Sequence, residues 1–357
     1  MKFLRRTILF LTFLLVLVSC KNSKVEKIEY KKFSRTFFGV FDTEIAFTAY
    51  CKDEKEFNEY FTFLESDMKR YHNLYNSFEN VDFNNIKTIN DNAGKKPVEV
   101  DREIIELLEF SIDSYKKVSD KNSVAIGAVT SLWKTQKDLA VDLQGQLPNG
   151  EKISQALNHI NIDNIVIDKV NNTVYLKDEF MKLDVGAIAK GYSVEKVINK
   201  LKDKGLKNLI ISAGGNVKAI GTPKEKDKNK WGIGIQLPKY DSGNIEIKDV
   251  IFSEETCAVT SGDYQRFFYV DGKVYNHIID PKTGYPNDKI KSVTVLYKDS
   301  AMADFLSTSL FLQTVEEGKE TLSKIPGAEA FWILPDGSVD YTKGMEIMLK
   351  SKGATNK

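Results

Sequence analysis

Residues 301–313 combine a helical pattern of apolar residues with the polar side chains of Asp304, Ser307 and Thr308. Asp304 and Thr308 are four residues apart, so on a helix both point from one face on successive turns. An ionised carboxylate inside an apolar helix is costly unless it has a partner. A carboxylate with hydroxyls is a hard oxygen set that suits Mg²⁺. The pattern therefore predicts a magnesium site, although a helix N-terminus or a distant lysine could also satisfy Asp304.

A second polar motif, residues 184–192, follows a short strand and opens a helix that Gly205 is expected to end. A strand, a glycine turn and a helix often present backbone N–H groups to a phosphate. Neither named phosphate motif is complete, because no Lys-Ser/Thr follows Gly191 and the Gly-x-Gly-x-x-Gly fingerprint lacks its middle glycine. From the residues alone, a nucleotide-phosphate site and a tightly packed turn are both open.

His277 and Asp280 lie at the end of a predicted strand, just before the punctuated loop 281–286. Histidine titrates near neutral pH, so a displayed histidine is suited to take a proton from a hydroxyl. A histidine that only fixes the turn by a hydrogen bond would give the same pattern. His72 and His159 lie in helix-like segments without partner motifs, and we interpret both as structural.

Interleaved helices and strands must position these groups. Residues 38–50 alternate apolar and polar side chains, as a half-buried strand does. Asp53 and Asp101 are suited to cap two amphipathic helices that begin after them. Short strands are expected at residues 173–176, 181–183, 209–212 and 217–221.

Turn signals complete this prediction. Asp271-Gly272 indicates a hairpin turn, and the polar stretch 133–154, with Pro148-Asn149-Gly150, predicts a surface loop. No internal repeat and no linker divides the chain convincingly. We therefore expect a single α+β domain over residues 36–350, with strands and helices interleaved.

The N-terminus has the pattern of an export and lipidation signal. Residues 2–6 carry three positive charges, and the apolar run 7–18 is shorter than the about 20 residues of a transmembrane helix. The run ends in Leu17-Val18-Ser19-Cys20, which resembles a bacterial lipobox. We expect residues 1–19 to be a lipoprotein signal peptide, and residues 20–35 to be a lipidated Cys20 with a polar tether on the extracytoplasmic face of the cell membrane. An ordinary signal peptide with an incidental cysteine is the alternative.

Composition excludes several classes of protein. With 357 residues, 42% hydrophobic and 28% charged, the chain can bury a substantial core and is not disordered. Its net charge is +1, and loss of three positive charges with the signal peptide leaves −2, which argues against nucleic acid binding. Three cysteines cannot make a disulfide scaffold. Cys51 and Cys257 could pair, but nothing in the sequence requires it.

Five motifs occur in order along the chain, at residues 184–192, 212–216, 260–264, 277–284 and 303–308. Their order and spacing resemble the ApbE family of FAD:protein FMN transferases. The resemblance spans roughly residues 37–341, and the lipobox agrees with it because many members are lipoproteins. Residues 89–94 and the region of Trp133 resemble the form found in Gram-positive bacteria.

The resemblance implies an ApbE-like mixed α/β fold and Mg²⁺-dependent transfer of FMN from FAD, the substrate, to a Thr or Ser hydroxyl of an exported flavoprotein, with release of AMP. His277, as the base for that hydroxyl, and Asp304 are the predicted catalytic residues. The predicted metal ligands are Ala187 through its carbonyl, Asp304, Ser307 and Thr308. The predicted FAD contacts are Phe41, Phe78, Asp184, Lys190 and the backbone at Ile279.

The chain departs from the family pattern at its FAD contacts. Phe41-Asp42-Thr43 stands in place of Met-Gly-Thr, and Asn76-Ser77-Phe78 in place of Ser-Thr-Tyr, so Phe78 can stack but lacks the hydroxyl. Residues 122–125 replace the usual Phe-Asp-x-Thr. Two other functions use similar residues. One is an FAD pyrophosphatase in which water replaces the acceptor hydroxyl, and the other is a lipid-anchored flavin-binding protein.

Overall fold

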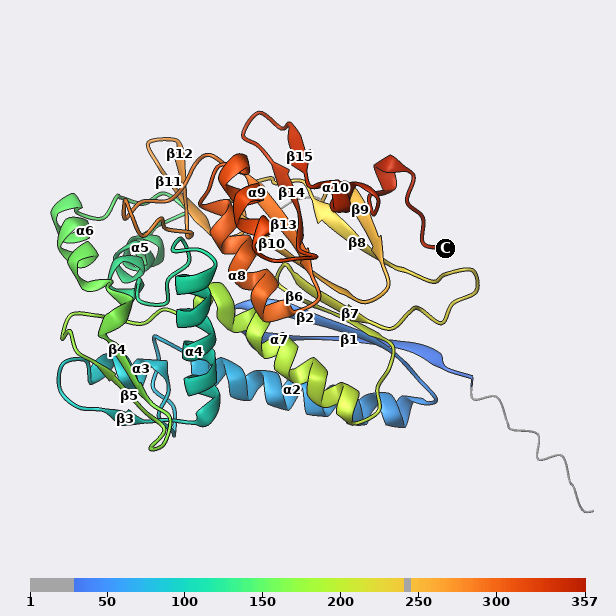
Figure 1. Cartoon of the computed structure of the whole chain (residues 1–357), viewed down its shortest axis with the longest axis horizontal. Coiled ribbons are helices and arrows are strands. Elements are labelled where there is room, and N and C mark those ends of the chain that lie inside the picture. Colours follow the sequence, from blue (N-terminus) through green and yellow to red (C-terminus); the bar gives the residue numbers. More distant parts are fainter. Residues whose placement is uncertain (1–28, 241–244) are drawn as a thin grey trace, which may run out of the picture. The chain divides into compact units, whose positions relative to one another are not determined.

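The computed structural model describes residues 29–240 and 245–357, and Lys31–Lys357 form one compact unit (Figure 1). The predicted signal peptide and Cys20 lie outside the described residues. Residues 31–35, which we expected in the tether, instead begin the first strand, β1 (Lys31–Val40). In the part of the chain that is described, no helix is both long and apolar enough to cross a membrane.

The prediction of a single strand over residues 38–50 is wrong, because two antiparallel strands occupy this region. β1 pairs with β2 (Thr43–Cys51), and Val40 faces Thr43 across a two-residue turn. Phe41 and Asp42 form this turn with φ of 53° and 52°. Such turns normally use Gly or Asn at these left-handed positions, so the sequence offers no turn signal here.

The central feature is an antiparallel eight-stranded sheet in the order β1-β2-β6-β7-β10-β13-β14-β15. Its remaining strands are β6 (Leu209–Ala213), β7 (Asn216–Ile220), β10 (Thr256–Gly262), β13 (Ser292–Tyr297), β14 (Glu329–Ile333) and β15 (Val339–Tyr341). Alternate residues of one strand lie in two different core clusters, for example Val295 in one and Leu296 in the other. The central strands of the sheet are therefore buried on both faces, whereas most residues of the edge strand β1 are exposed.

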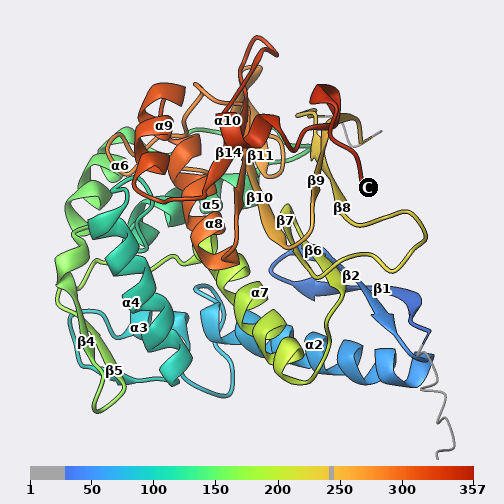
Figure 2. The ribbon, with the colours of Figure 1, turned by 45° about the vertical axis from the view of Figure 1, so that its right-hand side comes forward.

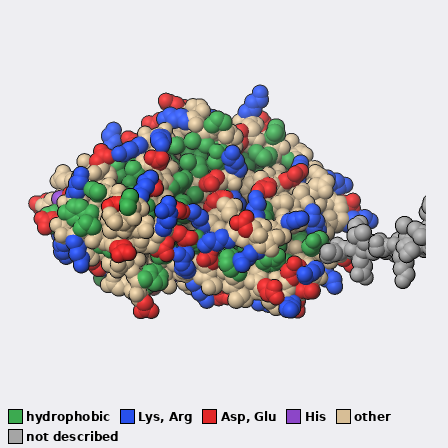
Figure 3. All heavy atoms as spheres, turned by 60° about the horizontal axis from the view of Figure 1, so that its bottom comes forward, with side chains coloured by type: hydrophobic (Ala, Val, Ile, Leu, Met, Phe, Trp, Pro, Cys, Tyr) green, Lys and Arg blue, Asp and Glu red, His purple; other side chains and the backbone are tan. Residues whose placement is uncertain are grey.

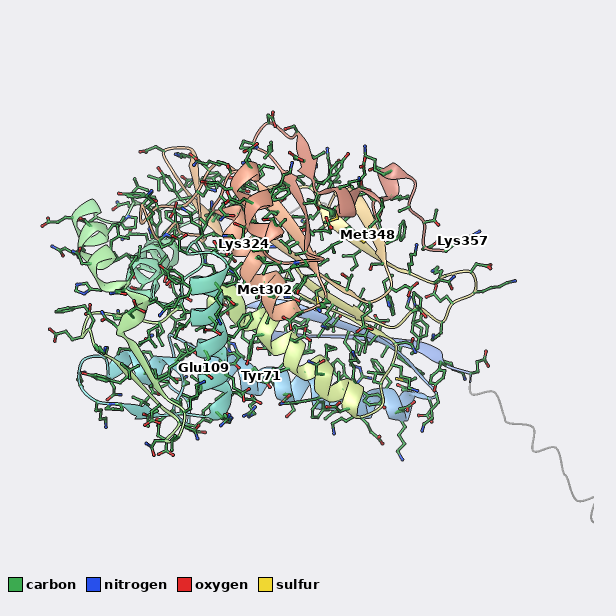
Figure 4. All side chains as sticks on the ribbon, in the orientation of Figure 1. Tyr71, Glu109, Met302, Lys324, Met348 and Lys357 are labelled. Carbon is green, nitrogen blue, oxygen red and sulfur yellow. The ribbon has the colours of Figure 1, made fainter. Side chains whose placement is uncertain are left out.

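A layer of helices covers one face of the sheet (Figures 1 and 2). It contains α2 (Glu54–Tyr75), α7 (Gly186–Asp203), α8 (Ser300–Phe311) and α9 (Val315–Ser323). Asp53 caps α2 by accepting the Glu56 N–H, as predicted, and Gly205 follows α7 with φ of 99°. Figure 4 labels Tyr71 of α2 and Met302 of α8 within this layer. The layer matters because α7 and α8 carry two of the predicted motifs.

The other face is covered by a hairpin and short helical segments near the C-terminus. The hairpin is β8 (Trp231–Gln236) with β9 (Ile247–Ser253), followed later by α10 (Lys343–Glu346) and the 3-10 turn η3 (Lys350–Lys352). Ile233, Ile251 and Met345 pack there against Phe331 of β14. These elements support the sheet from the side opposite α7 and α8.

The remaining elements flank the helical layer. They are α3 (Ile86–Asp91), β3 (Val98–Glu99), α4 (Arg102–Lys117), α5 (Gly127–Leu139), α6 (Gly150–Ala156), η1 (Leu157–His159), η2 (Ile162–Asn164), β4 (Ile165–Asp168), β5 (Thr173–Leu176), β11 (Phe267–Val270) and β12 (Lys273–Asn276). Asp101 caps α4 as predicted. Charged side chains of both signs are interspersed over the face in Figure 3.

Two local predictions in this region are wrong. Residues 133–154 are not one loop, because α5 continues to Leu139 and α6 begins at Gly150; Trp133 is 3% exposed and donates its indole N–H to the Gly284 carbonyl at 2.8 Å. Residues 181–183 form no strand, because β5 pairs with β4 and β3 instead. Both errors come from contacts with distant segments, which local polarity does not report.

Candidate active site

The site is built where α7 meets α8, and Gly191 makes this approach possible. A Cβ atom at Gly191 would lie 2.4 Å from Cβ of Asp304 and 2.4 Å from the carbonyl oxygen of Ser300. Only a residue without a side chain fits between the two helices here. The glycine that the sequence placed in a possible phosphate turn therefore brings the backbone of α7 against Asp304.

Asp304 is 3% exposed, as the apolar pattern of its helix predicted. Its Oδ2 accepts the backbone N–H of Gly191 at 2.7 Å, and its Oδ1 lies 3.8 Å from Nζ of Lys190. Burial raises the pKa of this carboxyl, while Lys190 and the Gly191 N–H oppose the shift. Two of the predicted motifs thus meet at one carboxylate, and the partners left open in the sequence are a lysine and a backbone N–H of α7.

Three hydroxyls on α8 and β10 form a connected group, which contacts Asp304 through its backbone carbonyl. Ser307 is fully buried; its Oγ donates to the carbonyl of Asp304 at 3.0 Å and lies 2.9 Å from Oγ of Ser261. Thr308 is half-buried, and its Oγ1 lies 3.5 Å from the same Ser261 oxygen. Ser307 is therefore occupied in joining α8 to β10, whereas Thr308 is the more open oxygen.

Asp184 organises the start of α7. Its Oδ1 accepts the N–H of Gly186 at 2.9 Å, and its Oδ2 accepts the hydroxyl of Thr130 on α5 at 2.7 Å. Ala187 lies in the first turn of this helix. In a regular helix its carbonyl would accept from the Gly191 N–H, which here donates to Asp304. Sequence reasoning missed Thr130, because nothing local indicates a partner 54 residues away.

His277 stands at the open end of the β11–β12 hairpin, whose Asp271-Gly272 turn was predicted correctly. Its backbone N–H donates to the carbonyl of Arg266 at 3.1 Å, and its Nδ1 lies 3.1 Å from the same oxygen. A carbonyl only accepts hydrogen bonds, so this contact requires Nδ1 to carry the proton. In the neutral ring, Nε2 is then the basic nitrogen.

The electrostatics of His277 favour this neutral form. The residue as a whole is exposed, yet desolvation by the protein around its ring is the largest cause that lowers the pKa of His277, followed by the positive charge of Arg266. The hydrogen bond to the Arg266 carbonyl opposes this shift, and the charge of Lys190 adds to it. Solvent at the exposed side moderates the size of the shift and leaves its direction unchanged. A histidine held neutral is suited to accept a proton.

The Phe41–Asp42 turn is clamped from both sides. The N–H of Phe41 donates to Nδ1 of His72 at 3.2 Å, and its carbonyl accepts from Nη2 of Arg266 at 3.0 Å. The Phe41 and His72 rings meet edge to face with centroids 5.5 Å apart. The sequence predicts a structural role for His72. Its ring does accept a hydrogen bond from a backbone N–H, and that N–H belongs to Phe41, a predicted FAD contact. Arg266 links this turn to His277.

The other predicted FAD contacts lie around α5. Phe78 is 50% exposed after α2, and Nζ of Lys134 lies 4.9 Å from its ring centroid. Ile279 is 5% exposed and packs with Trp133, so only its backbone can face a ligand. Direct contacts join Lys190 to the Asp304 carboxylate and the Ser307 hydroxyl to the Asp304 backbone carbonyl. Phe78 is linked to the rest of the site through α5, because this helix carries both Lys134, which contacts Phe78, and Thr130, which contacts Asp184.

The donor set fits a magnesium ion better than a transition metal. Among the described residues, no group of three or more His, Cys, Asp or Glu side chains is placed to hold a metal. One carboxylate with a hydroxyl and a backbone carbonyl is a sparse set of hard oxygens. Mg²⁺ commonly uses such sets, taking the rest of its shell from water and substrate phosphates.

The sequence matches the ApbE family over residues 41–332. The FAD:protein FMN transferase of Treponema pallidum (strain Nichols) is 32% identical over 279 residues, 74% of this chain and 75% of that protein. That of Klebsiella pneumoniae (strain 342) is 31% identical over 286 residues, 80% and 82% of the two chains.

Solved structures agree with this assignment. The ApbE protein from Thermotoga maritima superposes with a TM-score of 0.78 at 27% identity, covering 89% of this chain and 99% of that one. The flavin transferase ApbE from Vibrio cholerae has the same fold, with a TM-score of 0.72 at 22% identity over 88% and 97% of the chains. The chain therefore belongs to the ApbE family. The family, the single mixed α+β domain and the class of enzyme predicted from the sequence are confirmed.

Proposed function

We propose that this chain is a Mg²⁺-dependent FAD:protein FMN transferase that acts on an exported flavoprotein. The observation that carries the proposal is the buried Asp304 carboxylate, which meets Lys190 and the Gly191 N–H beside the Thr308 hydroxyl. A pyrophosphate needs positive charge and N–H donors on one side and oxygen ligands for its cation on the other. Lys190 of α7 supplies the positive charge, and Asp304 with Thr308 of α8 supplies the oxygen ligands, while the Gly191 N–H holds the Asp304 carboxylate in place.

In the proposed reaction, the hydroxyl oxygen of a Thr or Ser side chain attacks the FMN-side phosphorus of FAD. A new P–O bond forms, the bridging P–O bond of the pyrophosphate breaks, and AMP leaves. Nε2 of His277 takes the hydroxyl proton, a role supported by the Nδ1 contact with Arg266 and by the lowered pKa of the ring. The leaving AMP takes the bridging oxygen as part of its phosphate.

Asp304 and Thr308, with the carbonyl of Ala187 and with Ser307, are the proposed ligands of Mg²⁺, which would neutralise charge on the pyrophosphate. Lys190 would offset the remaining phosphate charge. Asp184, Phe41, Phe78 and the backbone at Ile279 are the proposed FAD contacts. Phe41 and Phe78 supply aromatic faces for a flavin or adenine ring.

We infer that the enzyme works outside the cytoplasm, anchored through a lipid on Cys20. The lipobox supports this inference. Palmitate labelling of the expressed chain tests it, because Cys20→Ser should abolish labelling and release the protein from membranes. Labelling that survives this substitution would overturn the anchor at Cys20.

The function is tested by mixing the mature chain with FAD, Mg²⁺ and an exported flavoprotein domain that carries a Ser/Thr flavinylation site. Both proteins are then weighed by mass spectrometry. We expect the acceptor to gain one FMN, with AMP released, and Asp304→Asn to abolish the gain. Asp113→Asn, exposed on α4, is the matched control. Free FMN and AMP with unmodified acceptor would indicate the pyrophosphatase, and intact bound FAD would indicate a binding protein.

A further inference from the structure

The last residue of α5 and the loop that follows it expose several large apolar side chains. Leu139, Val141, Leu143 and Leu147 are 69%, 72%, 47% and 41% exposed. We call residues 139–147 the apolar loop. Single exposed apolar residues are common, but several within one short segment are typical of a binding surface.

The apolar loop is held firmly in this exposed arrangement. Asp142 and Leu143 have φ of 49° and 63°, a left-handed conformation that is costly for leucine. The N–H of Tyr269 donates to the Leu143 carbonyl at 2.7 Å, and the Tyr269 carbonyl accepts the Gly145 N–H at 2.9 Å. A Cβ at Gly145 would lie 2.7 Å from the Phe268 ring. The backbone is thus fastened to β11 while the leucine and valine side chains point outward.

This attachment places the apolar loop beside His277. Gln144 bridges to Tyr269 on β11, three residues beyond Arg266, whose carbonyl holds His277. At about 3.3 Å per residue along a strand, the attachment lies about 10 Å from the open end of the hairpin. The positive charge of Lys137, on the last turn of α5, also acts on His277. The apolar loop and the proposed base are therefore attached to the same β11–β12 hairpin.

We propose that the apolar loop is the docking surface for the flavoprotein that receives FMN. This inference rests on the proposed function. Of the two substrates, FAD is small and needs a concave site, whereas the acceptor protein must bring a hydroxyl to Nε2 of His277 and cover a wide surface around it. Exposed apolar side chains with polar neighbours are the composition of such protein interfaces.

Charges around the apolar loop favour a protein over a lipid surface. Lys134 pairs with Asp138 at 2.6 Å, and Asp142 lies at the tip of the loop, in the two-residue turn between Val141 and Gln144. Binding to anionic lipid needs a cluster of Lys and Arg, which these mixed charges do not provide. The acceptor is therefore the partner that this surface fits.

The test compares Val141→Asp/Leu143→Asp with Val170→Asp in the mature chain. Aspartate tolerates the left-handed conformation at residue 143 better than leucine does, so the substitution should leave the fold intact. Val170, 89% exposed between β4 and β5, is the control for an aspartate placed at another exposed apolar position. Binding of the acceptor domain, without FAD, is measured by biolayer interferometry, and KM for acceptor and for FAD are measured in the transfer assay.

We expect the double variant to weaken acceptor binding and raise KM for the acceptor by about tenfold or more, the loss typical of an interface centre. KM for FAD and the Val170→Asp variant should stay at the wild-type values. Unchanged acceptor binding in the double variant would overturn the proposal. Binding to anionic vesicles is measured alongside, and a double variant that loses only this binding would also overturn the proposal. Acceptor binding that depends on the loop without any FMN transfer would instead overturn the proposed function alone.

Discussion

Asp304 shows how one residue can be costly for folding and useful for chemistry. Burial disfavours its ionised form, and the carboxylate is stabilised by one lysine and one backbone N–H. Buried carboxylates whose pKa is strongly perturbed by burial and by a specific charge are typical of functional sites. Thr308 nearby is only half-buried, so this group of oxygens is open on the side away from the core.

His277→Gln tests the proposed base at the same scale. We expect kcat for FMN transfer to fall about 10²- to 10⁴-fold, the usual contribution of general base catalysis, while FAD binding is retained. Because the pKa of His277 is lowered, the wild-type ring stays neutral as pH falls through about 6.5, the ordinary histidine value. The pH profile of kcat/KM should therefore lose activity only at still lower pH. An acidic limb centred at or above the ordinary value would contradict this assignment.

Gly191→Ala tests the contact between α7 and α8. The new methyl group would overlap Cβ of Asp304 and the Ser300 carbonyl, so we expect a loss of about 1–3 kcal/mol in the free energy of unfolding. Urea unfolding followed by circular dichroism measures it. Gly150→Ala, where a Cβ meets only Tyr285 Oη at 3.6 Å, is the control and should change stability little. Equal stability of the two variants would show that the helices adjust freely.

At the scale of elements, two hairpins cooperate through Arg266. Its carbonyl holds His277 at the end of β12, and its guanidinium holds the Phe41 carbonyl in the β1–β2 turn, 3.7 Å from the Asp42 carboxylate. A turn with two non-glycine residues at positive φ persists only where its surroundings hold it. The two hairpins therefore position a proposed FAD contact and the proposed base together.

We expect Arg266→Met to weaken FAD binding about tenfold, as the loss of a charged hydrogen bond implies. Removing the positive charge should also raise the pKa of His277, so the acidic limb of kcat/KM moves to higher pH. Arg266→Lys keeps the charge and should move the limb less. Fluorescence titration of FAD and the pH profile measure the two effects. A purely structural role would change stability without moving the limb.

Lys218 of β7 joins the sheet to α7 and α8. It is 4% exposed; its Nζ lies 2.6 Å from Oε2 of Glu195, which also accepts the N–H of Ser300 at 2.7 Å. Lys218→Met leaves the partly buried Glu195 carboxylate without its cation, and we expect a loss of about 1–3 kcal/mol in unfolding free energy. Adding Glu195→Gln removes that charge and should recover much of the loss. Thermal and urea unfolding of the single and double variants measure these free energies. If the losses of the two single variants simply add in the double variant, Lys218 and Glu195 do not stabilise each other.

At the scale of the whole molecule, the sheet order answers whether the two cysteines pair. Cys51 ends β2 and Cys257 lies in β10, with β6 and β7 between them. Three strand spacings of about 4.8 Å put them about 14 Å apart, whereas a disulfide needs Cα atoms within about 7 Å. Both are free and buried thiols.

The thiols therefore report global unfolding. Burial raises the pKa of Cys51 and of Cys257 to about 12 each. In the mature chain at pH 8, we expect neither to react with iodoacetamide, and both to react in denaturant. Peptide mass spectrometry after alkylation measures this. Rapid labelling of Cys257 in native protein would show that the sheet opens locally at β10.

Much of this architecture is local enough to be predicted. Asp53, Asp101, Gly205 and the Asp271-Gly272 pair gave helix and turn boundaries that the structure confirms, because caps and left-handed turns depend on neighbouring residues. The Phe41–Asp42 turn was missed because its residues are atypical and their support comes from His72 and Arg266. The helix that contains Trp133 was missed because its packing partners lie far along the chain.

The sequence by itself determined the motifs, the mixed class of fold and the burial of Asp304, since these follow from residue types and their spacing along the chain. Only the tertiary structure decided the partners: Lys190 and Gly191 for Asp304, Thr130 for Asp184, and Arg266 for His277. The physical reason is that each of these contacts joins segments from different elements. Their meeting depends on how the sheet orders its strands and on which helix faces pack together, and local spacing does not encode either.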